Sequence, residues 1–229
     1  MTDYVLIHGA YQGAWIWREV AARLRAAGGR VFAPTLDGCG ERRGSLRSGI
    51  TTESHAEDVA RLLYYEDLRD AVLVGTSSGG MVMAKAAEQA RDRVGRLVFA
   101  DALALLHGER IRDVVTRPAA IENDLGLGPT IEDAAVRLFA GLDDATRAWA
   151  ADRCTLHPRA VFYQPVDLPT FWSEQWDASV LYCSRAPNPG EAHQRRAQNA
   201  LNAKWHCLDT GHYPMLSMPD ELTRIILEG

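Results

Sequence analysis

The chain has 229 residues, enough for one large domain with a well-buried core, and its 47% hydrophobic and 24% charged residues are ordinary for a soluble globular protein. Its formal net charge of −5, with both signs interspersed, argues against nucleic acid as the main partner, because phosphate binding needs a clustered positive surface. No apolar run approaches the length that spans a bilayer, and the first residues lack the pattern of a secretion signal. We therefore expect a cytoplasmic protein without nucleic-acid or membrane partners.

The cysteines do not form a recognisable framework. The four of them stand far apart in the sequence, at Cys39, Cys154, Cys183 and Cys207. In a long chain without a secretion signal, this spacing favours free buried thiols over disulfides. No cysteine and histidine pair has the spacing of a zinc site, so we expect neither a metal nor a cofactor.

Short apolar runs alternate with helical patterns along the chain. The apolar runs cover residues 4–9, 30–38, 71–77, 96–103, 179–184 and 204–212. Helical patterns cover residues 13–29, 50–68, 78–92 and 217–229, the last with Ser217 as its expected N-cap. Most runs are continuously apolar, as in strands that are covered on both faces of a parallel sheet. The pattern predicts an α/β fold whose central sheet is mostly parallel and flanked by helices.

Residues 107–177 break this alternation. They contain short helical patterns over 131–142 and 143–154, followed by an aromatic stretch with prolines over 157–176. A structureless loop of this length is improbable in a compact domain. We therefore predict an inserted helical cap over 107–177, on a core formed by 1–106 and 178–229. Its aromatic side chains would in part pack against the core and in part line an apolar substrate pocket.

The stretch from Gly75 to Gly79 fits the pattern G-x-S-x-G, with Ser77 in the serine position. This pattern needs a sharp turn from a strand into a helix, which strains the serine and exposes its hydroxyl, while the glycines let neighbouring backbone come close. Ser78 does not fit, because Thr76 instead of glycine stands two residues before it. The motif follows a predicted strand and opens a predicted helix, so Ser77 is the candidate nucleophile.

A serine nucleophile needs a base and a carboxylate that orients the base. His212 follows the last predicted strand, at the edge where open α/β sheets place their ligands. Asp101 ends the strand after the nucleophile helix, and the order Ser77, Asp101, His212 obeys the usual order of serine, acid and histidine. Glu191 is the alternative acid, and Asp209 stands too near His212 in sequence to face its ring.

Backbone N–H groups must stabilise the oxyanion that develops during acyl transfer. One is the N–H of Ser78, which follows the nucleophile, and the other is expected in the loop after the first strand, at Ala10. His8 in the same loop would then shape the turn and take no part in the chemistry.

The segments "YVLIHGAYQGAW", "LVGTSSGGMV", "LVFADAL" and "TGHYPMLSMPDEL" together resemble the α/β-hydrolase superfamily. The similarity is greatest to the small lidded esterases that include plant methylesterases, hydroxynitrile lyases and their actinobacterial relatives. The resemblance implies Ser77 as nucleophile, His212 as base, and oxyanion donors at Ala10 and Ser78. The bacterial relatives place the acid where this chain has Asp101, whereas the plant enzymes place it after the penultimate strand.

Two departures from this family stand out. Thr76 occupies a position where relatives commonly have histidine, so the substrate contacts or the packing of the turn differ. The lyases have lysine after the catalytic histidine and threonine where this chain has Gly9. Here Tyr213 follows His212, so the resemblance does not extend to cyanohydrin cleavage.

These observations lead to three hypotheses for the function. The first is a cofactor-free serine hydrolase that cleaves a small, largely apolar or aromatic carboxylic ester, lactone or thioester through an acyl-enzyme on Ser77. The second keeps the fold but performs carbon–carbon cleavage, elimination or cyclisation on an aromatic or polyketide-like metabolite. The third is a non-catalytic receptor for a small molecule, because the fold does not fix the function. The sequence leaves the oligomeric state open, with a homodimer as one option.

Overall fold

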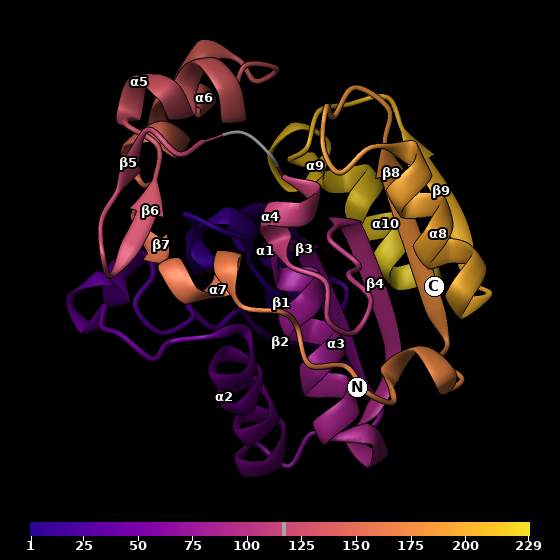
Figure 1. The fold of residues 1–229 in the computed structure, drawn as a ribbon. Coiled ribbons are helices and arrows are strands. Elements are labelled where there is room, and N and C mark those ends of the chain that lie inside the picture. Colours follow the sequence, from indigo (N-terminus) through magenta and orange to yellow (C-terminus); the bar gives the residue numbers. More distant parts are fainter. Residues whose placement is uncertain (116–117) are drawn as a thin grey trace.

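The computed structural model describes residues 1–115 and 118–229, and its centre is a six-stranded sheet in the order β2-β1-β3-β4-β8-β9 (Figure 1). Every pairing in this sheet is parallel. Its strands are β1 (Asp3–Ile7), β2 (Arg30–Phe32), β3 (Ala71–Ser77), β4 (Val94–Ala102), β8 (Ala178–Cys183) and β9 (Lys204–Leu208). Each lies within or overlaps a predicted apolar run, so the predicted parallel α/β fold is confirmed.

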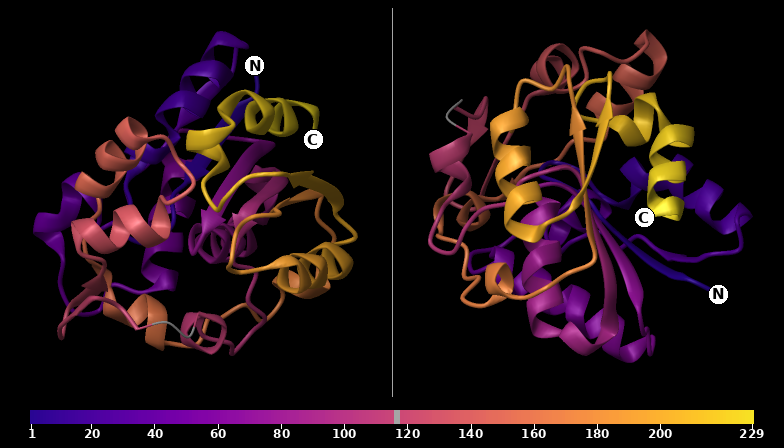
Figure 2. Two further views of the ribbon diagram at one scale, coloured as in Figure 1. Left: turned by 90° about the horizontal axis from the view of Figure 1, so that it is seen from above. Right: turned by 90° about the vertical axis from the view of Figure 1, so that its right-hand side faces the viewer.

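Helices cover both faces of the sheet, as the two views of Figure 2 show. One face carries α2 (Thr52–Tyr65), α3 (Gly79–Gln89) and α8 (Glu191–Leu201), and the other carries η1 (Ala14–Trp17), α1 (Arg18–Ala26), α9 (Pro214–Ser217) and α10 (Pro219–Glu228). Side chains along each strand alternate between these layers, so that Leu73 packs on the α3 side and Val74 on the α1 side. This is why the strands read as continuously apolar in the sequence. Two short 3-10 turns, η2 (Gly40–Ser45) and η3 (Arg91–Arg93), join these elements.

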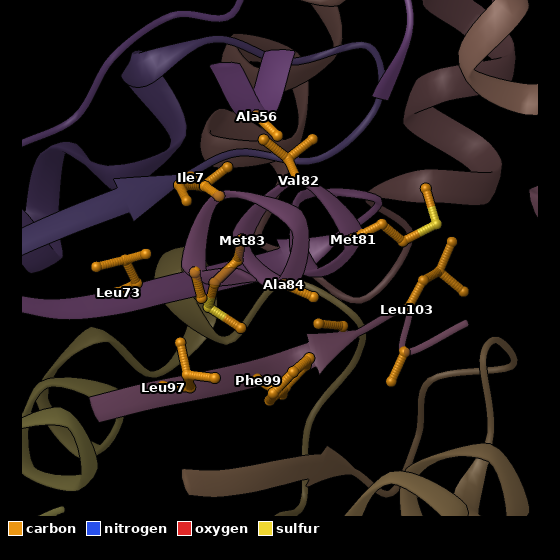
Figure 3. Close-up of a cluster of buried hydrophobic side chains, with 14 of the residues drawn as sticks. Ile7, Ala56, Leu73, Met81, Val82, Met83, Ala84, Leu97, Phe99 and Leu103 are labelled. Atoms are coloured by element: carbon orange, nitrogen blue, oxygen red, sulfur yellow. The ribbon is translucent and has the colours of Figure 1, made fainter. Parts of the chain in front are cut away.

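Helix α3 lies at the centre of the molecule. Its residues from Gly79 to Ala87 are all buried, because the sheet covers one side of the helix and α2 covers another. In Figure 3, Val82 lies next to Ala56 of α2, while Met83 points toward Leu97 of β4. Because the helix is enclosed on these sides, both α3 and the turn that precedes it are held firmly in place.

The strand order places a switch point between β1 and β3. The chain leaves β1 toward β2 on one side, then returns to β3 on the other side of β1. Connections that diverge in this way leave a crevice at the carboxyl ends of the two strands, which is where open α/β sheets bind ligands. The loops after Ile7 and Ser77 border this crevice.

The segment between β4 and β8 has a different construction. It contains the helical elements α4 (Ile111–Val114), α5 (Ile131–Asp133), the π-helical η4 (Ala134–Leu138), α6 (Asp144–Asp152), α7 (Arg159–Tyr163) and the 3-10 turn η5 (Phe171–Ser173). It also contains a small antiparallel sheet of β5 (Ile121–Glu122), β6 (Gly126–Gly128) and β7 (His157–Pro158), which the sequence did not predict. Strands of two or three residues are too short to show a period-two pattern.

One helix boundary was predicted wrongly. Helix α10 begins at Pro219 with Met218 as its N-cap, and Ser217 instead ends α9. The Ser217 hydroxyl bonds to the Thr210 hydroxyl at 2.6 Å and donates to the Tyr213 carbonyl oxygen at 3.2 Å. Among the helices that the structure describes, none is both long and apolar enough to cross a membrane.

Candidate active site

Ser77 lies at the end of β3, in the turn that enters α3. Its φ is 50°, in the left-handed region that non-glycine residues rarely adopt, whereas the next residue, Ser78, is already helical. A Cβ on Gly79 would lie 2.6 Å from the carbonyl oxygen of His8, and a Cβ on Gly75 would lie 2.8 Å from that of Gly79. Only glycine fits either position. The motif therefore forms the strained strand-to-helix turn that its sequence predicts.

His212 and Asp101 are far apart in sequence but form a close pair. His212 lies in the loop between β9 and α9, and its Nδ1 is 2.6 Å from Oδ2 of Asp101. The Asp101 side chain is completely buried, and its Oδ1 accepts a hydrogen bond of 3.1 Å from the backbone N–H of Cys183. A carboxylate held in this way fixes the orientation of the imidazole ring. Because Nδ1 faces the carboxylate, Nε2 is the ring nitrogen that is available for proton transfer.

A bulge in β4 presents Asp101 to the histidine. Thr76 pairs with Ala100 and Ser77 pairs with Ala102, so Asp101 is the extra residue between two pairs. Its φ of 47° places it in the left-handed region as well. In a regular strand this side chain would point into one of the helix layers, where an unpaired carboxylate is costly. The bulge turns it instead toward β8 and the loop that carries His212.

The structure does not bring the alternative acids to His212. Glu191 lies in the first turn of α8 and pairs with Arg195 at 3.3 Å. Asp209 contacts Ser184 and Arg185 on the neighbouring loop.

Ser77, His212 and the two predicted oxyanion donors line one cavity of about 360 Å³. Ala10 enters it from the loop after β1, and Ser78 from the start of α3. The two loops are in close contact, because a Cβ on Gly9 would lie 2.5 Å from the Cβ of Ser77. The residues that the sequence proposed for catalysis therefore line the crevice at the switch point, with the exception of Asp101. Asp101 is buried and contacts His212, which does line the cavity.

His8 supports the loop that carries Ala10. Its Nδ1 lies 2.8 Å from the carbonyl oxygen of Gly9, and its Nε2 accepts a hydrogen bond of 3.0 Å from the N–H of Leu36. Burial lowers the pKa of His8 to about 4, which keeps the ring neutral and allows Nε2 to accept. These contacts agree with a structural role for His8.

The outer wall of the cavity comes from the segment between β4 and β8. Its apolar part includes Ile111, Val115, Leu138 and Phe162. Six aromatic residues were considered from the sequence, and of these Phe162 lines the cavity, whereas Trp149, Tyr163, Phe171, Trp172 and Trp176 do not. Trp149 packs against Trp15 with ring centroids 5.3 Å apart. The other four, Tyr163, Phe171, Trp172 and Trp176, also pack away from the cavity. The mixture that the sequence suggested is present, with most of the rings away from the cavity.

Thr76 is fully buried and does not line the cavity. Its hydroxyl has no hydrogen-bond partner among the residues that the structure describes. The departure from histidine at this position therefore concerns the packing behind the turn and involves no contact with a substrate. Sequence reasoning missed Tyr11, Arg137 and Arg185, which do line the cavity. Nothing in the local pattern around them sets them apart from ordinary surface or core residues.

A parallel sheet with a switch point, a serine in a strained turn and a histidine–aspartate pair on the same cavity is the arrangement of α/β-fold serine hydrolases. The chain belongs to the alpha/beta hydrolase family, whose pattern matches residues 4–225. The resemblance inferred from the motifs is confirmed, and with it the class of enzyme.

Several relatives of known sequence are esterases. The chain is 30% identical, over 97% of its own length and 97% of the other, to a carbendazim hydrolyzing esterase of Nocardioides sp. (strain SG-4G). It is also 36% identical to methylesterase 8 of Arabidopsis thaliana, but this match covers 42% of the chain and 36% of the plant protein.

Solved structures show the same fold. An extracellular alpha/beta-hydrolase from a Paenibacillus species has a TM-score of 0.79 at 24% identity, with 100% of this chain and 98% of the other covered. A methylesterase from Arabidopsis has a TM-score of 0.82 at 19% identity, with the same coverage.

Proposed function

We propose that this chain hydrolyses a small carboxylic ester through an acyl-enzyme on Ser77. The observation that carries the proposal is the convergence on one cavity of a strained serine and a histidine whose Nδ1 lies 2.6 Å from a buried aspartate. The relatives support it, because the one that matches over nearly the full length is named as an esterase.

The mechanism follows from the roles of these groups. The Ser77 hydroxyl oxygen attacks the carbonyl carbon of the ester while its proton passes to Nε2 of His212. Asp101 accepts the hydrogen bond from Nδ1–H and stabilises the imidazolium, and the N–H groups of Ala10 and Ser78 bind the oxyanion. The C–O bond then breaks, and Nε2–H protonates the departing alcohol. Water, activated by the same histidine, cleaves the acyl-enzyme, releases the acid and restores the serine.

The cavity limits the size of the substrate. A space of about 360 Å³ with largely apolar walls suits a small ester with an apolar or aromatic body, and a lactone or thioester would react by the same steps. Residues 107–177 supply the outer wall, which supports their role as a cap over the core. The carbon–carbon cleavage considered from the sequence rested on an aromatic cap, and most of those rings lie outside the cavity. A receptor would have no need of the strained serine turn.

A matched pair of serine variants tests the proposal. Ser77→Ala should lower kcat for a short p-nitrophenyl ester by about 10⁴-fold or more, because no other group replaces the nucleophile. Ser78→Ala keeps its backbone N–H and should keep activity within a few fold. Product analysis should give acid and alcohol in equal amounts, and circular dichroism should show both variants folded. Turnover retained by Ser77→Ala would contradict the proposal.

The substrate, the location in the cell and the oligomeric state can be tested separately. The substrate is a small molecule, and we expect the protein to act in the cytoplasm, which cell fractionation would check. Sedimentation at several concentrations would show whether the protein forms a homodimer.

A further inference from the structure

Among the described residues, two arginines are the charged side chains that line the cavity. Arg137 reaches it from η4 in the outer wall, and Arg185 reaches it from the loop after β8. Among the described residues that line the cavity there is no aspartate or glutamate, because Asp101 lies behind His212. The cavity beside Ser77 therefore combines apolar walls with two guanidinium groups.

The two arginines differ in how they are held. Arg185 is the more exposed of the two, with 66% of its side chain accessible, and its Nε lies 3.2 Å from the carboxylate of Asp209. Its Nη2 also donates to the Asp209 carbonyl oxygen. Arg185 is thus already bound at the mouth of the cavity.

Arg137 is better placed to bind a ligand inside. Its side chain is 34% exposed, and Nη1 bonds to Oδ1 of Asp133 at 2.7 Å, one helical turn away. That bond uses one of the five N–H donors of the guanidinium, and Asp133 does not line the cavity. Burial raises the pKa of Tyr11, which also lines the cavity; the positive charges of Arg137 and Arg112 oppose this rise, and the negative charge of Asp133 adds to it. Arg137 therefore lines the cavity, whereas its partner Asp133 does not.

The local backbone presents Arg137 in an unusual way. The turn from Ala134 to Leu138 is π-helical, closed by the N–H of Phe139, which donates to the carbonyl oxygen of Ala134 at 3.0 Å. The extra residue in such a turn shifts the side chains that follow relative to a regular helix, and such turns often occur at functional sites.

We propose that Arg137 binds a carboxylate on the substrate, so that the enzyme acts on monoanionic esters, such as half-esters of small dicarboxylic acids. This rests on the proposed esterase function and names the substrate class of the same site. A carboxylate entering a largely apolar cavity loses its water and needs a cationic partner there. Arginine suits this task because its planar N–H groups match the two carboxylate oxygens.

Two esters of similar length distinguish the effect of the substrate's charge on activity from the effect of its shape. p-Nitrophenyl valerate is neutral, and mono-p-nitrophenyl glutarate carries a carboxylate at the end of a similar chain. Arg137→Gln should lower kcat/KM for the glutarate at least tenfold, mainly through KM, and change that for the valerate less than twofold. Arg137→Lys should recover part of the loss.

Arg147→Gln is a matched control. Arg147 belongs to α6 of the same segment, is also 34% exposed and is also ion-paired, with Asp144, but it does not line the cavity. Its loss should leave both esters unaffected. An equal loss on both esters in Arg137→Gln, or no loss on either, would overturn the inference.

A binding measurement separates this inference from the esterase proposal. Calorimetry on Ser77→Ala, with and without Arg137→Gln, reports binding of the glutarate half-ester without turnover. Binding that weakens tenfold or more in the double variant supports the role of Arg137 even if the wild type cleaves neither ester, which would contradict the esterase proposal alone. Cleavage of the valerate together with binding of the half-ester that does not depend on Arg137 would contradict this inference alone.

Discussion

At the scale of single residues, the position of Asp101 depends on one irregularity in β4. The bulge at this residue turns its carboxylate out of the sheet layers, and the N–H of Cys183 and the ring of His212 then hold its two oxygens. A buried carboxylate with two directed partners is well suited to orient a ring and poorly suited to any other task in an apolar core.

Asp101→Asn tests this assignment. The amide oxygen can still accept from the N–H of Cys183, but the amide favours the wrong tautomer of His212, so we expect kcat to fall by about 10⁴-fold with little change in KM. Steady-state kinetics with a p-nitrophenyl ester would measure the loss. Glu191→Gln serves as the control and should stay within twofold. A larger loss in Glu191→Gln than in Asp101→Asn would show that the acid is assigned wrongly.

At the scale of elements, the end of α3 ties the segment 107–177 to the core. Oε1 of Glu88 accepts from the N–H and hydroxyl of Thr170 and from the N–H of Phe171, at 2.7 to 2.8 Å. Lys85, one turn earlier, bonds to Glu88 at 2.8 Å and to Asp167 at 3.2 Å. The helix that begins at the candidate nucleophile thus also anchors the chain that returns from the outer wall of the cavity.

Glu88→Ala should therefore be costly. It leaves two backbone N–H groups without their partner and the nearly buried ammonium of Lys85 with Asp167 alone, and we expect the free energy of unfolding to fall by about 3 kcal/mol. Urea denaturation would measure this change. Glu57→Ala removes a carboxylate that pairs with Arg61 on an exposed face of α2 and should cost less than about 0.5 kcal/mol. Similar values for the two variants would contradict the anchoring role.

At the scale of the whole molecule, buried histidines join three separate parts of the chain. His8 follows β1, His55 belongs to α2, and His157 belongs to β7 in the segment 107–177. The rings of His55 and His157 lie 5.8 Å apart, and His157 Nδ1 lies 3.3 Å from Sγ of Cys39. Burial lowers the pKa of each of these histidines, so the rings are neutral where the core contacts the segment 107–177.

This arrangement predicts how stability depends on pH. The unfolded chain binds protons near pH 6.5 while the folded rings do not, so stability is fully present above pH 6.5 and is lost as pH falls toward the folded pKa. For His8, with a folded pKa of about 4, the loss at pH 5 is about 2 kcal/mol. Urea denaturation at pH 7, 6 and 5 would measure it.

A further buried histidine, His193, offers a variant that tests whether buried histidines cause the loss of stability at low pH. The backbone N–H of Ala104 donates a hydrogen bond of 2.8 Å to Nε2 of His193, and burial lowers the pKa of His193 to about 4 as well. His193→Gln should reduce the dependence of the free energy of unfolding on pH, because it removes one of these buried neutral rings. A free energy of unfolding that stays constant from pH 7 to pH 5 would contradict the account of neutral rings.

The sequence could predict those parts of the molecule that follow from periodic patterns and local motifs. Continuous apolar runs indicated the parallel strands, and the glycines around Ser77 indicated the strained turn, because both depend on neighbours in sequence. The contacts of Arg137 with the cavity depend on a π-helical turn and on packing across the fold, which leave no local pattern. The strands β5, β6 and β7 are too short to produce a recognisable pattern in the sequence.

Covalent labelling would show whether Ser77 is the nucleophile. A fluorophosphonate should modify the protein once, on the peptide of residues 70–85 that trypsin would release. This peptide contains both Ser77 and Ser78, so fragmentation in the mass spectrometer must place the adduct. We predict an adduct on Ser77, labelling of Ser78→Ala at nearly the rate of the wild type, and none in Ser77→Ala. An adduct on Ser78, or labelling that persists in Ser77→Ala, would contradict the account.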